Sequence, residues 1–114
     1  MKDNSLDDFN QAMNAGEGAT TVVLFYGSWL PEAACKDMLA TYDALSSRFR
    51  EVKLLRFSVN EQTHIPMALG VKAIPAIFSF KGNALMDNKY GFMNDARMAE
   101  FIQQAVDGGA TDEY

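Results

Sequence analysis

The segment that decides the fold is residues 22–36, VVLFYGSWLPEAACK. It lies within an apolar, β-branched stretch from Thr20 to Tyr26, which is typical of a strand covered on both faces of a sheet. Gly27-Ser28 ends the strand, and Pro31 suits the first position of a helix, where its missing amide hydrogen costs nothing. The helix carries one apolar stripe at spacings of 3, 4, 3 and 4 residues: Cys35, Met38, Tyr42, Leu45 and Phe49. The segment therefore predicts a buried strand followed by a helix packed on it.

The rest of the chain continues this alternation. Ser5 and Asp8 form an acidic variant of a capping box, which predicts a first helix over residues 5–15. The other predicted elements are strands over 52–59, 76–80 and 84–87, a short helix over 63–69 capped by Thr63, and a last helix from Asn94 or Asp95. A strand, helix, strand unit makes a right-handed parallel crossover, and the turn at 81–83 makes the last two strands antiparallel. We therefore expect an α/β fold with a mixed central sheet flanked by helices on both faces.

Composition limits the possible functions. The chain has 114 residues, the size of one domain, which we place at 1–107, before an acidic tail at 108–114 that we expect to be loose. The net charge is −5 and no stretch concentrates basic residues, so nucleic acid and membranes are not expected as partners. The longest apolar run, residues 22–26, is too short to span a bilayer, and the N-terminus lacks a signal-peptide core. These features predict a cytoplasmic protein.

The single cysteine, Cys35, excludes an intramolecular disulfide. With His64 as the one histidine, a structural zinc site is not expected, and no other cofactor is predicted. The place of Cys35 on the apolar stripe favours a buried, inert thiol. A helix that begins near Ala33 would instead put Cys35 in the first turn, where the helix dipole and Lys36 favour the thiolate. A helix that begins at Pro31 would leave Cys35 beyond that turn.

Four features, in their order along the chain, resemble the thioredoxin family. They are the segment 22–29 that ends in Trp29, the Cys35-Lys36 pair that opens a long helix, Ile74-Pro75 before a strand, and Gly91 after the hairpin. The resemblance covers about residues 6–106 and implies the thioredoxin fold. It also implies that Ile74-Pro75 is a cis-proline step that offers the backbone of Ile74 to an extended peptide, with an ordinary trans turn as the alternative. Trp29 would then shape the recognition surface.

The redox motif is degenerate. Members of this family carry Trp-Cys-x-x-Cys-Lys, whereas here Leu30 follows Trp29 and two extra residues precede Cys35. Cys35 matches the second, resolving cysteine, so the first, attacking cysteine is missing. Because a dithiol enzyme needs a second thiol to resolve its mixed disulfide, we expect no dithiol-disulfide reductase activity. The family's buried acidic residue is also replaced, by Leu24, which removes a proton acceptor.

The function we expect is binding, with a link to cell redox homeostasis implied by the resemblance. An extended peptide or a cysteine-bearing protein would lie across Trp29, the loop that contains Leu30 and Pro31, and the Ile74-Pro75 step. The methionines could form an adaptable binding surface or simply fill the core. The alternative function is a monothiol oxidoreductase in which Cys35 attacks a disulfide and an external thiol resolves the adduct.

Overall fold

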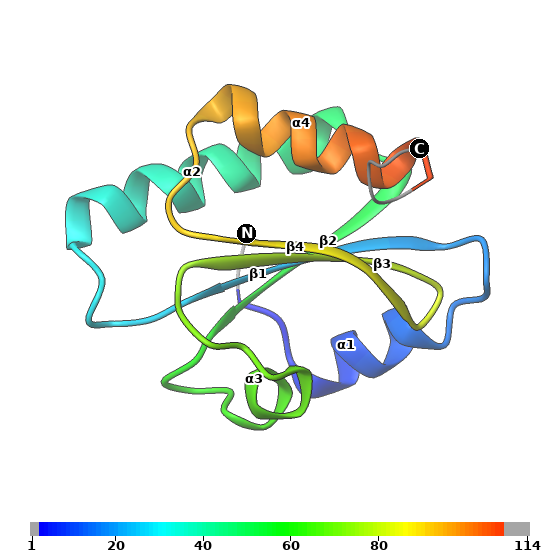
Figure 1. The fold of residues 1–114 in the computed structure, drawn as a ribbon, viewed down its shortest axis with the longest axis horizontal. Coiled ribbons are helices and arrows are strands. Elements are labelled where there is room, and N and C mark those ends of the chain that lie inside the picture. The colour runs from blue at the N-terminus through cyan, green and yellow to red at the C-terminus, as the bar shows by residue number, and fades with distance from the viewer. Residues whose placement is uncertain (1–2, 109–114) are drawn as a thin grey trace.

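The computed structural model describes residues 3–108, so the predicted tail lies, from residue 109 onward, outside the described residues. The helices and strands follow the predicted order (Figure 1). They are α1 (Leu6–Met13), β1 (Thr20–Tyr26), α2 (Glu32–Arg48), β2 (Val52–Ser58), α3 (His64–Leu69), β3 (Ala76–Lys81), β4 (Ala84–Tyr90) and α4 (Asp95–Val106). Among residues 3–108, no helix is both long and apolar enough to cross a membrane.

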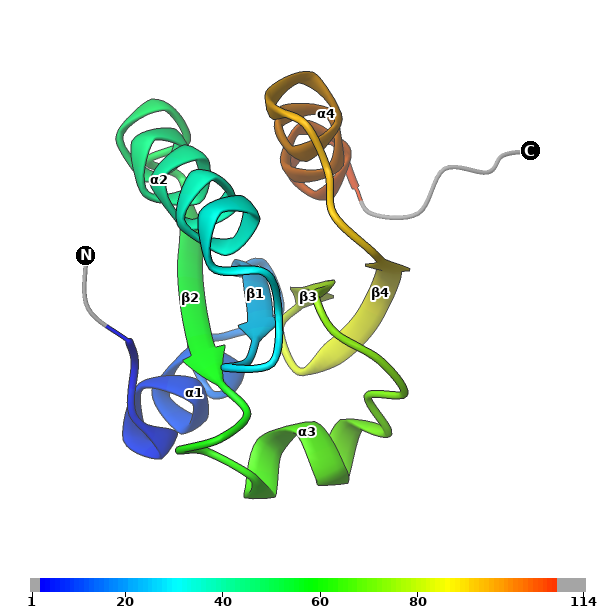
Figure 2. The same cartoon turned by 90° about the vertical axis from the view of Figure 1, so that its left-hand side faces the viewer.

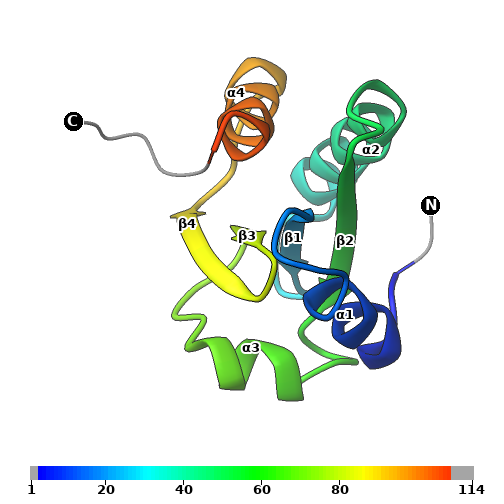
Figure 3. The same cartoon turned by 90° about the vertical axis from the view of Figure 1, so that its right-hand side faces the viewer.

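The four strands form one mixed sheet in the order β2-β1-β3-β4. β1 runs parallel to β2 and antiparallel to β3, and β3 forms an antiparallel hairpin with β4. The end-on views show α2 and α4 on one face of this sheet and α1 and α3 on the other (Figure 2, Figure 3). The predicted mixed sheet with helices on both faces is therefore confirmed.

Three local predictions needed correction. Pro31 is the residue before α2 and not its first residue, since the helix begins at Glu32. Thr63 precedes α3 but makes no side-chain cap hydrogen bond; the Gln62 side-chain oxygen accepts the amide hydrogens of His64 (2.9 Å) and Ile65 (3.3 Å) instead. β4 extends to residue 90, three residues beyond the predicted strand, because pairing with β3 continues there despite the polar sequence.

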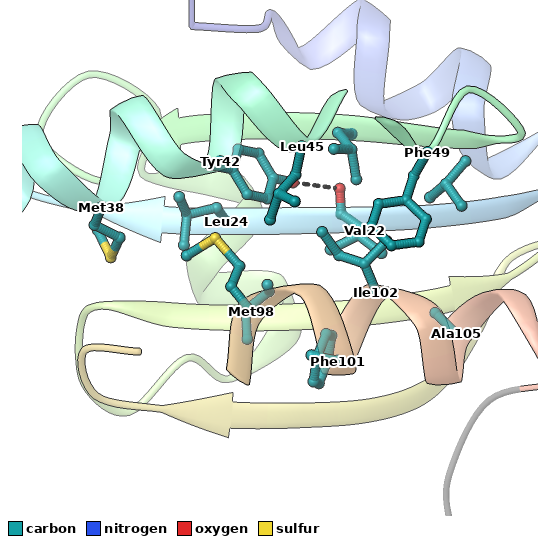
Figure 4. Close-up of a cluster of buried hydrophobic side chains, with 13 residues drawn as sticks. Val22, Leu24, Met38, Tyr42, Leu45, Phe49, Met98, Phe101, Ile102 and Ala105 are labelled. Atoms are coloured by element: carbon teal, nitrogen blue, oxygen red, sulfur yellow. Dashed lines mark hydrogen bonds between the residues drawn. The ribbon is translucent and has the colours of Figure 1, made fainter. Parts of the chain in front are cut away.

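Each face of the sheet has its own apolar core. β1 supplies both, because its alternate residues point to opposite faces. Val22 and Leu24 pack under α2 and α4, where Figure 4 shows them beside Met98 and Ile102. On the other face, Phe9 of α1 packs edge-on against Phe57 and Phe80, with ring centroids 6.3 and 6.0 Å away. The buried strand predicted from its apolar run is confirmed.

Tyr42 ties α2 to the centre of the sheet. Its side chain is fully buried, and its hydroxyl lies 2.7 Å from the carbonyl oxygen of Leu55 and 2.9 Å from that of Val22. Figure 4 shows the bond to Val22. Burial raises the pKa of Tyr42 well above its ordinary value, so the hydroxyl stays a neutral donor. The helix that carries Cys35 is therefore anchored to both β1 and β2.

Candidate functional site

The candidate site lies where β1 ends and β3 begins. Because these strands are antiparallel and Phe25 pairs with Ala76, the loop that leaves β1 and the loop that enters β3 lie side by side. Gly27 allows their close approach, since a Cβ atom on it would lie 2.6 Å from Cδ1 of Ile74. The backbone of Gly27 is not left-handed, so the constraint on this residue is steric.

Hydrogen bonds from two backbone amides hold the loop of residues 27–31 in place. The amide of Ser28 donates to Oδ1 of Asn60 at 2.7 Å, and the amide of Leu30 donates to the carbonyl of Gly27 at 3.2 Å. These bonds fix the backbone on either side of Trp29. The Trp29 side chain remains 65 % exposed. A large aromatic group is thus displayed on an ordered loop.

A groove of about 530 Å³, which we call the Trp29 groove, runs beside this residue. Its apolar walls come from the loop after β1, the residue that follows β2, the region of α3 and the loop before β3: Trp29, Val59, Pro66, Met67, Val71 and Ile74. Thr63, Lys72 and Ala73 complete the lining. Met67 is 80 % exposed, so the groove is flanked by two large apolar side chains that the described chain leaves uncovered. A surface of this kind commonly marks a binding site.

The Ile74-Pro75 step forms one edge of the site, and its peptide bond is cis. The ring of Pro75 is buried, and its carbonyl accepts the amide hydrogen of Gly91 at 2.8 Å. Gly91 has a φ of 101°, a left-handed conformation that suits glycine. Within residues 3–108, the amide and carbonyl groups of Ile74 make no hydrogen bond. The groove therefore has an unpaired backbone donor and acceptor at its rim.

The residues singled out from the sequence do not all meet. Trp29 and Ile74 line the groove together. The other predicted residues are not part of its lining: Leu30, Pro31, Cys35 and Pro75. Leu30 is half-buried and Pro31 is exposed on the loop that leads into α2. The groove and the thiol are thus separate features of this region.

Cys35 is half-buried against the core under α2 and α4. Its amide donates to the carbonyl of Pro31 at 2.9 Å, so Cys35 is the first residue of α2 whose amide makes a helical hydrogen bond to the residue four positions earlier. The unpaired amides at the helix start belong to earlier residues, and the helix start at Glu32 places Cys35 at the end of the first turn. Burial raises the pKa of the Cys35 thiol; the nearby Arg56 cation lowers it, and Asp3 raises it further. The thiol is therefore mostly protonated at neutral pH.

A polar cluster beside Cys35 was missed by the sequence reasoning. Arg56 donates to Asp3 at 3.0 Å and to Asp43 at 3.1 Å, and the Tyr26 hydroxyl donates to Asp3 at 2.6 Å. Burial and the bond to Asp3 both raise the pKa of Tyr26. The sequence of β2 contained a sign of this cluster. Val52 and Leu54 point into the core on one face of the sheet, and Arg56, the next residue on that face, is charged.

Arg56 also occupies an informative place in the sheet. It pairs with Leu24 on the neighbouring strand, where the resemblance led us to look for a buried acid. The charged groups that act on Cys35 are consequently the Arg56 cation and the Asp3 carboxylate, and neither comes from the Leu24 position. No group of three or more His, Cys, Asp or Glu side chains within residues 3–108 is placed to hold a metal ion.

Comparisons with known proteins agree on the family. The Thioredoxin family model matches residues 1–104. The thioredoxin of Rickettsia felis is 27 % identical over 86 residues, which cover 75 % of this chain and 80 % of the relative. The thioredoxin of Haemophilus influenzae is 25 % identical over 83 residues, or 72 % of this chain and 76 % of that protein.

Solved structures show the same fold. Fasciola hepatica thioredoxin superimposes with a TM-score of 0.76 at 22 % identity, covering 87 % of this chain and 92 % of that one. Malassezia sympodialis thioredoxin gives 0.75 at 24 % identity, covering 90 % and 86 %. With the mixed sheet and the family match over most of its length, this chain belongs to the thioredoxin family.

Proposed function

We propose that this protein binds an extended peptide segment, including segments that carry a cysteine, in the Trp29 groove. The observation that carries the proposal is the juxtaposition of an exposed apolar groove with the unpaired backbone of Ile74. An extended peptide can accept from the Ile74 amide and donate to its carbonyl, while one of its side chains enters the groove. Main-chain bonds would supply affinity and the groove would supply selectivity.

The proposal does not need a reaction. Cys35 is the only cysteine among 114 residues, so the chain cannot close a dithiol cycle by itself. We expect no catalysis of insulin reduction in a turbidity assay with dithiothreitol, beyond the rate of the reductant alone. Turnover at a rate typical of a dithiol enzyme would contradict this account of the degenerate motif.

Titration with peptides tests the binding proposal. Paired peptides that differ only by Cys or Ser separate recognition from disulfide formation, and amide chemical shifts at Ile74 and Ala76 report the binding edge. We expect both peptides to shift these signals. Trp29→Ala should weaken binding about tenfold, the size of loss seen for a central aromatic contact. Phe92→Ala, which removes an exposed aromatic ring outside the groove, is the matched control. Unchanged shifts with every peptide would refute the proposal.

The second candidate function is a monothiol oxidoreductase. Its support is that Cys35 is only half-buried, and that the nearby Arg56 cation partly offsets the rise in the pKa of Cys35 that burial causes. The Cys35 thiolate would attack one sulfur of a protein or glutathione disulfide, break the S–S bond and release the other sulfur as a thiolate. An external thiolate such as glutathione would then attack the outer sulfur of the mixed disulfide, form a new disulfide and release Cys35. The external thiol thus supplies the electrons that leave with the thiolate released from the original disulfide.

Reaction with a chromogenic disulfide at pH 7 distinguishes the two functions. Fast, stoichiometric release of the chromophore from native protein, abolished in Cys35→Ser, would support the oxidoreductase. Reaction only after denaturation would support a purely binding role. A cytoplasmic location and a part in redox homeostasis remain predictions, which localisation of the tagged protein and the thiol redox state of cells that lack it can check.

A further inference from the structure

The charge of the Trp29 groove is unusual for this chain. Lys72 is the one charged residue among the groove's nine lining residues. It is exposed, and within residues 3–108 it makes no ion pair. Lys36, at the start of α2, is paired with Glu32 at 3.2 Å. A protein with a net charge of −5 therefore presents an unpaired cation at an apolar groove.

The apolar walls of the groove indicate that part of its ligand is apolar. Trp29 and Met67 flank it from separate segments of the chain, and neither is covered. Methionine is unbranched and flexible, so this wall can adapt to bulky apolar side chains of different shapes. A volume of about 530 Å³ is within the range that holds a small ligand, so it suits a few residues of a peptide.

Lys72 lies close in the chain to the backbone groups that would pair with the peptide. Lys72 precedes Ile74 by two residues, and both line the groove. A peptide that pairs with the unpaired backbone of Ile74 would therefore run alongside the segment that carries Lys72. Because the overall charge repels strongly acidic chains at long range, the complement to Lys72 is a single carboxylate and not an acidic tract.

We propose that the peptide recognised by the Trp29 groove combines a bulky apolar side chain with one Asp or Glu close to it, and that Lys72 selects this carboxylate. This inference rests on the proposed binding function and adds the class of ligand. The apolar side chain fills the groove, and the carboxylate pairs with Lys72 at its rim. Lys72 is then a specificity-determining residue, since the apolar contacts alone would not distinguish Glu from Gln.

The test uses the full chain and short peptides with a Phe anchor and no tryptophan. In three pairs of peptides, Glu or Gln stands one, two or three residues from the Phe. Trp29 is the only tryptophan in the chain and lines the groove, so its fluorescence reports binding directly. We expect the best Glu peptide to bind about two- to fivefold more tightly than its Gln partner, the range for an exposed ion pair. The preference should shrink in 0.5 M NaCl.

Charge reversal separates Lys72 from a general effect of charge. Lys72→Glu should abolish the preference for Glu and favour a peptide with Lys at that position. Lys89→Glu changes the net charge equally but lies on β4, outside the groove, and should keep the preference for Glu. Equal binding of Glu and Gln peptides, or a preference that survives Lys72→Glu, would overturn this inference while leaving peptide binding intact. If no peptide changes the Trp29 fluorescence or the amide shifts at Ile74, both the binding function and this inference fail.

Discussion

Gly27→Ala tests the contact on which the candidate site depends. The added Cβ atom would lie 2.6 Å from Cδ1 of Ile74, 3.1 Å from Cγ2 of Val59 and 3.3 Å from Oδ1 of Asn60. Ordinary carbon contacts are about 3.5–4 Å, so the end of the Ile74 side chain must move by about 1 Å. Asn60 can yield little, because its Oδ1 accepts the Ser28 amide at 2.7 Å. The strain is therefore absorbed mainly at Ile74, in the wall of the Trp29 groove.

The cost of this substitution combines two effects. Inserting a methyl group into a packed region costs about 1–3 kcal/mol. Alanine also restricts the unfolded chain, which offsets about 0.4–1 kcal/mol. We expect a net loss of about 0.5–2 kcal/mol in the free energy of unfolding, which lowers the Tm by about 2–8 °C for a domain of this size.

Urea denaturation and the peptide titration measure the two consequences of Gly27→Ala. The variant should lose stability and bind the peptide more weakly, with shifted Ile74 signals in the free protein. Gly18→Ala is the control, because its added Cβ would meet nothing within 4 Å and its backbone is not left-handed. The control should be as stable as the native chain or slightly more so. A Gly27→Ala variant with native stability and native peptide affinity would refute the close approach of the two loops.

Three further predictions concern single groups. Asp3→Asn should lower the pKa of Cys35, because a negative charge near the thiolate is removed. The pH dependence of alkylation by iodoacetamide measures this pKa, and an unchanged pH profile would contradict the prediction. Tyr42→Phe should cost about 1–2 kcal/mol of unfolding free energy in urea, since a buried hydrogen bond is lost, whereas the exposed control Tyr90→Phe should cost almost nothing. Hydrogen bonds from the Ser5 amide and the Asn4 side chain lower the pKa of Asp8 in the folded chain. The stabilisation that Asp8 gives to the cap of α1 is therefore present above the ordinary pKa of 3.8, and it is lost as the pH falls through the lower folded pKa. The protection factors of the α1 amides, which compare exchange with its intrinsic rate at each pH, should therefore fall in acid more in the native chain than in Asp8→Asn, and an equal fall would contradict the role of this cap.

Much of the fold was predictable because it depends on local patterns. The apolar run of β1 signals burial on both faces, and the stripe from Met38 to Phe49 signals the inward side of α2. Helix boundaries were less accurate, since the first residue of α2 depends on one backbone hydrogen bond from Cys35 to Pro31. The extension of β4 to residue 90 depended on its partner strand, which a polar sequence does not reveal.

The candidate site was predictable only in part. Trp29 and Ile74 were identified through the resemblance, and the structure places both in one groove. Met67 and Lys72 could not be assigned to that groove, because they come from α3 and the following loop, whose position against Trp29 follows from the crossover to β3. Periodicity indicates which face of an element is apolar, but not which distant segment that face will meet.

The sequence by itself determined the order of elements and the single thiol, because these follow from residue identity and local spacing. The resemblance to the thioredoxin family then implied that the first cysteine of the dithiol motif is missing. Only the tertiary structure decided which side chains lie around that thiol and which lie elsewhere. Strand pairing brings Arg56 beside Leu24, and the N-terminal residue Asp3 then reaches Arg56 and Tyr26 across more than 20 positions of the chain. Cys35 is not among the residues that line the Trp29 groove. Electrostatics and exposure depend on such long-range neighbours, and no local pattern in the sequence specifies them.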